Sequence, residues 1–290
     1  MTTALRFAPP IGDRFGRYER NLAFGSKNGQ HQRSQKLLCC PCCAPLRSWP
    51  LPFGLTVNIH EAEAVTEQPP DLRMRRLTSF SIERASNGDK RLRFTTRIAN
   101  AGPGRFELHG YRHDTSTARM NIRQRIYNAS GTYRRIEIPR SSTYMFIAGD
   151  GHKHWHVHKL QRFEIRPLDA NGNEGELKGT GAKTGFCFWD NTTYNLSLPG
   201  APQAPYYTSC GKRESLNIKM GLSVGWSDKY SASLAYQWIK INGLQDGNYR
   251  VRVIANPYNW FLETNDANNS TSTDIHLSGG GTKVTVISAS

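Results

Sequence analysis

The residues best suited to chemistry lie in GDGHKHWHVHKLQRFEIRP, residues 149–167, where histidine occupies every second position around Trp155. Successive side chains of a β-strand point to opposite faces, so alternate imidazoles of a strand project to one side. Three imidazoles with an open fourth position suit copper or zinc. An exposed strand with a histidine-rich face and no ligand is the alternative. The histidines are His152, His154, His156 and His158.

A second group of candidate metal ligands lies in ETNDANN, residues 263–269. Carboxylate and amide oxygens crowd this short stretch, and clustered hard oxygen donors suit Ca²⁺. Asn and Asp also favour turns for their own conformational reasons, so a polar turn that closes a hairpin is the alternative.

The six cysteines fall into two groups. The first group is the CCPCC cluster, residues 39–43, whose overlapping C-x-x-C spacings suit zinc but lack a second cysteine pair to complete four ligands. Cys187 and Cys210 stand alone. They would close a loop of roughly 24 residues as a disulfide worth about 3 kcal/mol, or remain as two buried thiols.

The elements that must position these residues are predicted to be strands. In residues 91–100, RLRFTTRIAN, apolar and polar side chains alternate as in a half-buried strand, and YRVRVIANP (249–257) repeats that pattern. No amphipathic helix of useful length is found. The sequence therefore predicts an all-β fold, a β-sandwich of short antiparallel strands with long loops and little helix. Further predicted strands are 133–138, 155–166, 184–189, 235–241 and 270–277.

The chain divides into a leader, residues 1–70, and a regular body, residues 71–290. The leader is polar and shows no sustained hydrophobic period. Within it, residues 33–64 combine a basic start, a semi-apolar centre and a small-residue A-x-A exit, as in an export signal, although Arg47 and several prolines interrupt the centre. This pattern favours a secreted or periplasmic protein.

Charge and hydropathy exclude some classes of function. Of the formal net charge of +15, +12 falls on residues 71–290, which favours acidic surfaces or polyanions without identifying them. No nucleic-acid recognition motif accompanies the charge, so no specific nucleic-acid partner is expected. No apolar run is long enough for a membrane span. Nothing in the sequence specifies an oligomeric state.

The order of several blocks resembles the catalytic domain of the lysyl oxidase family. HKHWH is followed by AKTGFC (182–187), by GLSVGWSDKYSASLAYQWIKI (221–241) and by DGNYRVRVIANPYNWFLETNDANNSTSTDI (246–275). The resemblance covers roughly residues 71–278 and leaves residues 1–70 unexplained. It implies that the body is a short, bacterial-type member of that family.

The resemblance also implies roles for individual residues. His152, His154 and His156 match the copper ligands, whereas His158 has no ligand counterpart. Lys183 of AKTGFC and Tyr230 of SDKY match the residues that form lysine tyrosylquinone, a cofactor made by a crosslink within the chain. Copper and O2 oxidise the tyrosine ring, and a desolvated, neutral lysine amine then adds to it. Apart from the resemblance, Asp228 is the carboxylate nearest to Tyr230 in sequence and the candidate general base, with a turn cap as the alternative.

Calcium and a disulfide follow from the same resemblance. Some relatives bind calcium with the loop that corresponds to residues 263–269 and with an Asp-Leu pair, here Asp71 and the Leu72 carbonyl. Most family cysteines are replaced here, which implies that Cys187 and Cys210 pair with each other. Asn265 replaces an aspartate and should weaken calcium binding. The remaining implied calcium ligands are Glu263, Asn268 and Asn269.

The sequence thus predicts a copper- and quinone-dependent amine oxidase. It would convert peptidyl lysine or other primary amines to aldehydes with O2, releasing hydrogen peroxide and ammonia. The high positive charge of the body would repel a lysine-rich polycation and so favours small amines or lysines set among acidic residues. The alternative hypothesis is a non-enzymatic copper-binding β-sandwich in which the quinone never forms.

Overall fold

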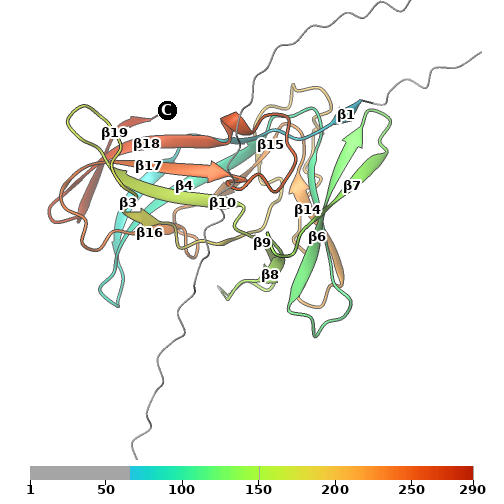
Figure 1. Ribbon diagram of the computed structural model, residues 1–290, viewed down its shortest axis with the longest axis horizontal. Coiled ribbons are helices and arrows are strands. Elements are labelled where there is room, and N and C mark those ends of the chain that lie inside the picture. Colours follow the sequence, from blue (N-terminus) through green and yellow to red (C-terminus); the bar gives the residue numbers. More distant parts are fainter. Residues whose placement is uncertain (1–65, 150, 290) are drawn as a thin grey trace, which may run out of the picture. The chain divides into compact units, whose positions relative to one another are not determined.

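The computed structural model describes residues 66–149 and 151–289 (Figure 1). Residues 1–65, with the CCPCC cluster and most of the predicted leader, lie outside the described residues. The described part already forms a strand at Glu67–Gln68 (β1), ahead of Asp71. Within it, the helical structure is one 3-10 turn, Asp266–Asn268 (η1), and no helix is long and apolar enough to cross a bilayer.

Strands of the described residues form three antiparallel sheets, as the all-β prediction requires. The five-stranded sheet has the order β11 (Gly179–Thr180), β10 (Gln161–Pro167), β17 (Gly247–Ala255), β18 (Ser270–Ser278) and β19 (Lys283–Ala289). The six-stranded sheet has the order β13 (Thr192–Thr193), β15 (Trp226–Tyr230), β4 (Lys90–Asn100) and β16 (Trp238–Lys240), with β2 (Leu72–Met74) and β3 (Thr78–Arg84) also paired to β4. The eight-stranded sheet has the order β12 (Gly185–Phe186), β9 (Trp155–His158), β8 (Met145–Ile147), β6 (Arg119–Asn128), β5 (Phe106–Tyr111) and β14 (Asn217–Leu222), with β1 and β7 (Tyr133–Ile138) also paired to β6.

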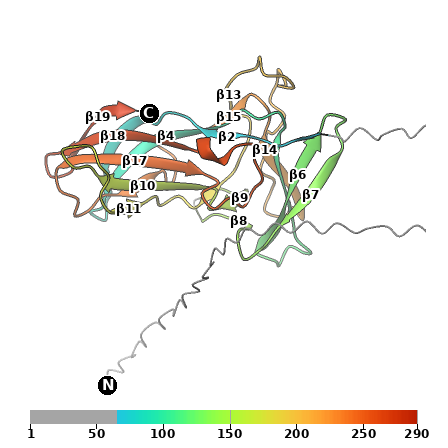
Figure 2. The same ribbon diagram turned by 45° about the horizontal axis from the view of Figure 1, so that its top comes forward.

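Side-chain alternation explains how the five- and six-stranded sheets pack. In β17, Val251 and Val253 are fully buried while Arg250 and Arg252 are half-exposed, so every second residue enters the core. Phe94 of β4 meets Phe163 of β10 with ring centroids 5.3 Å apart. The two sheets therefore form two layers over a shared core, and Figure 2 shows β4 behind β10 and β17.

The eight-stranded sheet joins that core through aromatic contacts. Phe106 packs edge-on against Phe188 and Phe261, with centroids 5.7 and 5.6 Å apart. Phe186 of β12 packs in the same way on Phe163 of β10, 6.2 Å away. Strands β9 and β15 carry predicted site residues, and β12 lies between two others in the sequence, Lys183 and Cys187. These three strands thus meet where the three sheets converge.

Three strand predictions need correction. The predicted strand 155–166 is two strands, β9 and β10, because Lys159 between them has a φ of 57° and turns the chain. The predicted strand 184–189 is reduced to β12, and 235–241 to β16. The predictions for 91–100, 133–138, 249–257 and 270–277 are confirmed as β4, β7, β17 and β18.

Candidate active site

The histidines at 152, 154 and 156 converge on one point. A ring nitrogen from each lies within 4.8 Å of the others, and the ring centroids are 4.7–5.8 Å apart. His156 is buried in β9, but His152 and His154 precede that strand. Convergence therefore does not follow from one continuous strand face, as the sequence had suggested, but from the local path of the chain.

Trp155 fixes that path. It is buried, its backbone amide donates to the Cys210 carbonyl at 3.1 Å, and its indole Nε1 donates to the Lys212 carbonyl at 2.8 Å. The Arg112 guanidinium lies over its ring at 4.7 Å. Since Trp155 is held on three sides, the imidazoles that flank it in sequence have little freedom to separate.

His158 does not join the cluster. Its ring stacks on Tyr144, with centroids 4.7 Å apart and planes 11° from parallel. Burial and the nearby cations Lys159 and Arg119 hold its pKa below the ordinary value. The His158 ring therefore packs on Tyr144 and not with the other three histidines.

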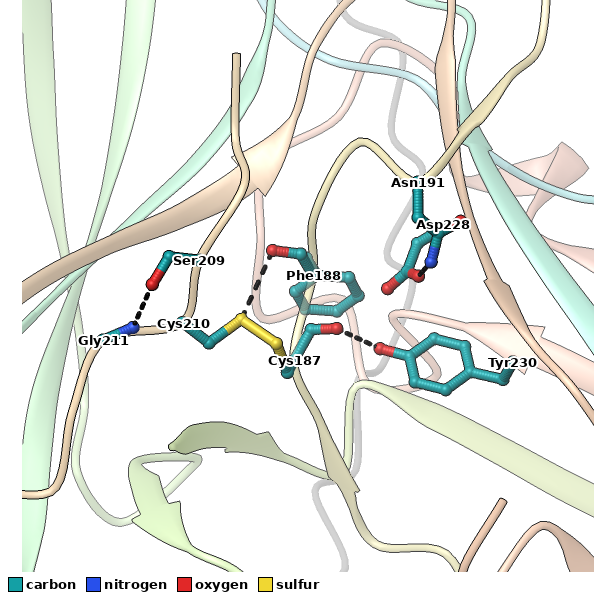
Figure 3. The surroundings of a disulfide bond; sticks show 8 residues. All are labelled: Cys187, Phe188, Asn191, Ser209, Cys210, Gly211, Asp228 and Tyr230. Carbon is teal, nitrogen blue, oxygen red and sulfur yellow. Dashed lines mark hydrogen bonds between the residues drawn. A yellow bond between two sulfur atoms is a disulfide. The ribbon is translucent and has the colours of Figure 1, made fainter. Parts of the chain in front are cut away.

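Lys183 and Tyr230 are neighbours although they come from distant parts of the chain, Lys183 from the segment just before β12 and Tyr230 from the end of β15. The Lys183 Nζ lies 5.4 Å from the centre of the Tyr230 ring, and both side chains are buried. Phe186 packs edge-on against the Tyr230 ring at 5.6 Å. The Tyr230 hydroxyl donates a hydrogen bond to the Cys187 carbonyl oxygen (Figure 3).

Asp228 lies two residues before Tyr230 and is fully buried. Burial raises its pKa to about 8, an effect that the hydrogen bond from Asn191 and the nearby positive charge of Lys183 partly offset. The Asn191 amide donates to Asp228 Oδ1 at 2.5 Å and accepts from the Lys229 backbone amide at 2.8 Å. Tyr230 in turn has its pKa raised well above the ordinary value by burial and by the charge of Asp228.

Asn191 was not found by sequence reasoning. It comes four residues after Cys187 in an irregular segment, and no motif assigned it a function. Only the fold shows that its amide spans the Asp228 carboxylate and the backbone of β15 (Figure 3).

The Cys187–Cys210 disulfide is present, as predicted, with Cα atoms 5.9 Å apart. The Cys187 carbonyl accepts a hydrogen bond from the Tyr230 hydroxyl, and the Cys210 carbonyl accepts one from the Trp155 backbone amide. One covalent bridge therefore ties the segment that contacts Tyr230 to the segment that holds the histidines (Figure 3).

A cavity of about 480 Å³ joins the histidine cluster to the Lys183, Asp228 and Tyr230 side chains. Trp189 and Leu234 add apolar wall, and Thr208–Gly211 forms another side. The cavity is lined, among others, by His152, His154, His156, Lys183, Asp228 and Tyr230.

The histidine cluster fits a copper or zinc ion by its chemistry. Two nitrogens bound to one such ion at about 2 Å lie no more than about 4 Å apart. The observed upper limit of 4.8 Å therefore needs only a small closing rotation of the rings. Nitrogen-only donors with an open position facing a cavity are typical of type-2 copper and of catalytic zinc.

The predicted calcium ligands also gather, in a separate place. Glu263 is buried and accepts from the Leu72 amide at 2.6 Å and from the Asn269 amide at 2.9 Å. Asn268 donates to Asp71 at 2.9 Å. The Oδ1 atoms of Asn268 and Asn269 are buried without a hydrogen-bond donor. These oxygens fit a hard cation.

One member of that set, Asn265, already accepts another hydrogen bond. The Asn265 side chain caps η1 by accepting from the Ala267 amide at 2.9 Å. The Leu72 amide is held by Glu263, and Leu72 pairs with Asn100 in the β2–β4 ladder. Burial raises the pKa of Glu263 to about 7.

Comparison with known proteins identifies relatives of this chain. A model of the lysyl oxidase family matches residues 110–287. Lysyl oxidase homolog 1 of Homo sapiens is 30% identical over 126 residues, which are 43% of this chain and 20% of that protein. Protein-lysine 6-oxidase of Gallus gallus is 30% identical over 128 residues, 43% of this chain and 27% of the relative. The matched segment thus spans only about a quarter or less of either relative.

Proposed function

Because the chain belongs to the lysyl oxidase family, we propose that it is a copper- and quinone-dependent amine oxidase. It converts primary amines, peptidyl lysine among them, to aldehydes. Amine, O2 and water are consumed, and aldehyde, hydrogen peroxide and ammonia are released. The observation that carries the proposal is the single cavity shared by three convergent imidazoles, Lys183 and Tyr230.

His152, His154 and His156 would hold the copper. When bound, copper supplies the oxidation of the Tyr230 ring by O2 to a quinone that Lys183 joins and that accepts substrate amines. The hard chemistry belongs to this cofactor, and the protein supplies position and proton transfer. The distance of 5.4 Å between Lys183 Nζ and the centre of the Tyr230 ring supports the crosslink, since a short approach brings the amine to the ring edge.

Asp228 is the proposed proton acceptor for the substrate α-carbon. A general base is most effective when its pKa lies near the working pH, and burial brings the pKa of Asp228 to about 8. Asn191 holds Oδ1, which leaves the buried Oδ2 of the carboxylate without a hydrogen-bond donor.

The cavity walls suit an aliphatic amine. Trp189, 42% exposed, and Leu234 give apolar surface for the methylene chain of a lysine or a small amine.

Because the disulfide of the site forms and persists in oxidising compartments, we also propose a secreted or periplasmic location. A structural calcium ion at Asp71, Leu72, Glu263, Asn268 and Asn269 completes the proposal.

Mass spectrometry of copper-loaded, aerated protein tests the enzyme directly. We expect tryptic peptides that contain Lys183 and Tyr230 to be covalently joined, and to be separate in metal-free protein. The joined form should absorb visible light, react with phenylhydrazine and release hydrogen peroxide when a primary amine is added.

Tyr230→Phe is the matched control. It should bind copper as the native protein does but show neither crosslink nor visible absorbance. Copper-loaded native protein with separate, unmodified peptides and no amine-dependent peroxide would falsify the enzyme proposal. The non-enzymatic copper-binding protein would then remain.

A further inference from the structure

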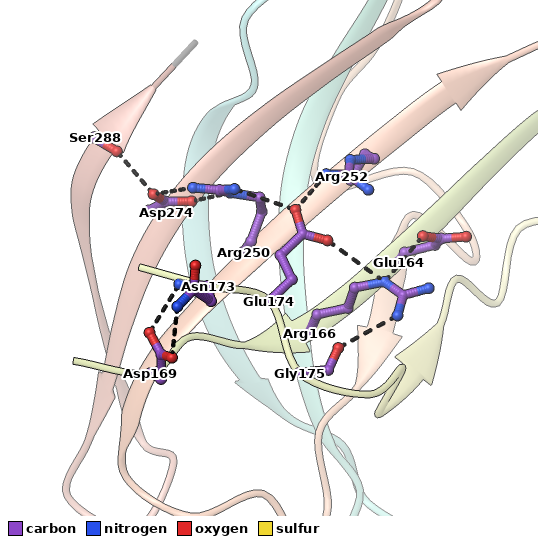
Figure 4. Close-up of polar contacts among 10 residues, drawn as sticks. All are labelled: Glu164, Arg166, Asp169, Asn173, Glu174, Gly175, Arg250, Arg252, Asp274 and Ser288. Carbon is purple, nitrogen blue, oxygen red and sulfur yellow. Dashed lines mark hydrogen bonds and ion pairs between the residues drawn. The ribbon is translucent and has the colours of Figure 1, made fainter. Parts of the chain in front are cut away.

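Several sheet faces of this protein carry rows of arginines, and they differ in how far carboxylates neutralise the charge. On the five-stranded sheet, Glu174 contacts Arg250 at 3.1 Å and also Arg166 and Arg252 (Figure 4). Asp274 accepts two hydrogen bonds from Arg250, at 2.7 and 2.8 Å. Each of these arginines meets a carboxylate, so this face presents a closed network rather than free charge.

The outward face of β14, β5, β6 and β7 differs, and we call it the basic sheet face. Its outward residues are the odd-numbered ones, because the even-numbered Met120, Ile122 and Met220 are buried. The strand register places Arg135 opposite Arg125, and Arg123 opposite His109, which pairs with Lys219. Its cations include Arg123, Arg125, Arg135 and Lys219, together with Arg105, which directly precedes β5.

The carboxylates on the basic sheet face do not balance these cations. Glu107 has a side chain only 1% exposed and pairs with Arg125 at 2.9 Å. Glu137 pairs with Arg123. Within the described part of the chain, no carboxylate forms an ion pair with Arg105, Arg135 or Lys219.

Each of these three cations lies over a tyrosine ring. The Arg105 guanidinium lies 4.6 Å from the ring centre of Tyr127 and 5.2 Å from that of Tyr206. Arg135 lies 5.4 Å from Tyr133, and Lys219 lies 5.9 Å from Tyr206. A guanidinium stacked on a ring can still present N–H groups for planar, bidentate recognition of a carboxylate, although Arg135 donates one of its own to the Tyr133 hydroxyl at 3.2 Å.

A cavity of about 310 Å³ lies at one end of the basic sheet face. Arg105, Tyr127 and Tyr206 line it, together with Gly104 and Pro202. This cavity is roomy enough for an acidic side chain. Its one cationic group is the Arg105 guanidinium, which has no carboxylate partner within the described residues.

The basic sheet face is next to the candidate active site along the chain. Tyr206 belongs to the face, while Thr208–Gly211 lines the cavity with the histidines and Tyr230. An extended chain advances at most about 3.6 Å per residue, so Tyr206 and Thr208 lie within about 7 Å. One bound polypeptide can therefore contact both places.

We infer that the basic sheet face binds an acidic polypeptide segment, with one carboxylate side chain entering the cavity at Arg105. Side chains at i and i+2 of an extended peptide lie about 7 Å apart on one side, the same spacing as alternate residues of the strands below. Alternate Glu or Asp residues thus match the sheet. The consequence, a preference for lysyl residues set among acidic ones, rests on the proposed function.

A binding measurement on metal-free protein tests the inference without turnover. The probe is a short fluorescent peptide with a central lysine flanked by glutamates, compared with the same peptide flanked by serines. In fluorescence anisotropy at about 0.15 M salt, the glutamate peptide should bind more tightly. The triple variant Arg105→Gln, Arg135→Gln, Lys219→Gln should weaken its binding by about tenfold, the loss expected for three exposed ion pairs.

The control variant is Arg84→Gln, Lys178→Gln, Lys283→Gln, which removes the same charge from exposed positions outside the eight-stranded sheet. It should change binding by less than about twofold. Equal losses in both variants, or no binding of the glutamate peptide, would overturn the inference. So would a sulfated polysaccharide or a DNA fragment that binds the same face more tightly than the peptide.

Turnover separates this inference from the proposed function. In copper-loaded enzyme, the face variant should raise KM for the glutamate peptide by about tenfold and leave KM for a small alkylamine unchanged. Peptide binding without any turnover would contradict the oxidase proposal and leave the docking face intact. An active enzyme whose peptide KM does not respond to the face variant would contradict the docking inference alone.

Discussion

Among single residues, Trp155 has the clearest positioning effect on the histidines. Its amide and indole are both bound by carbonyls of residues 210–212, so the chain on either side of it cannot extend freely. The imidazoles at 154 and 156 flank it directly. We therefore attribute convergence of the cluster to a buried aromatic anchor.

Replacing any one of His152, His154 or His156 by Ala should remove most of the bound copper. Loss of one of three nitrogen donors leaves a site that water must complete, which lowers affinity sharply. Metal analysis after copper loading and desalting measures the occupancy. His158→Ala is the control, because that ring stacks on Tyr144. If His158→Ala loses as much copper as the others, the assigned ligand set is wrong.

Asp228 predicts the pH dependence of turnover. A base must be ionised to accept a proton, so kcat/KM should rise with pH and level off above about 8, the pKa of this carboxyl. Asp228→Asn should lower kcat/KM by about 10²- to 10⁴-fold and abolish that rise. A variant that keeps the native pH profile would exclude Asp228 as the base.

Asn191→Ala offers a finer measurement on the same carboxyl. The hydrogen bond from Asn191 lowers the pKa of Asp228, so its removal should move the rising limb of the pH profile to higher pH. Activity at high pH should be largely retained. A uniform loss of activity with an unmoved limb would indicate that Asn191 supports the fold only.

Among the elements, sequence alternation predicted the long strands β4, β17 and β18 but missed the ten-residue β6, and it failed at the short strands. In β4 and β17 the period of two extends over many residues, and burial follows it. Between β9 and β10 the apolar pattern continues through Lys159, but its φ of 57° redirects the chain. Partners distant in sequence decide the short strands: β12 exists because it pairs with β9.

The candidate site, too, could be predicted from the sequence only in part. The residue types of the histidines, Lys183 and Tyr230 were visible in motifs, whereas their meeting at one cavity depends on three sheets. Asn191 left no pattern because its partners, Asp228 and Lys229, are far along the chain.

The disulfide should stabilise both the fold and the site. Replacing Cys187 and Cys210 by Ser removes a loop constraint worth about 3 kcal/mol, which chemical denaturation measures. It also loosens the Cys187 carbonyl that holds the Tyr230 hydroxyl, so crosslink formation should slow. Reductant should destabilise the native protein but not the double variant. Equal stability of the two proteins would contradict this role.

For the molecule as a whole, the proposed calcium ligands connect the start of the described chain to the loop between β17 and β18. The Leu72 amide bonds Glu263, 191 positions away, and Asp71 bonds Asn268, 197 positions away. These bonds attach β2 to the loop between β17 and β18, and so join the two layers of the sandwich. An ion at this point would stabilise the fold globally rather than locally.

The buried Glu263 gives that stabilisation a defined pH dependence. Its pKa is raised to about 7 in the fold from an ordinary value of 4.5, so the native state binds the proton more tightly than the unfolded chain does. Without calcium, stability should therefore fall as pH rises between 4.5 and about 7, by up to about 3 kcal/mol. Above that range the ionised carboxylate is available to a cation.

Calcium should consequently raise the melting temperature at pH 8 and have little effect at pH 5. At about 100 times its Kd, a ligand specific to the folded state adds about 2.7 kcal/mol, or about 5–10 °C for a domain of this size. Glu263→Gln keeps the side-chain volume but removes the charge, so it should abolish both the calcium response and the pH dependence. Magnesium is the matched control, since it fits irregular amide-rich sites poorly. A native protein whose melting temperature ignores calcium at pH 8 would leave these residues as a hydrogen-bonded junction between sheets.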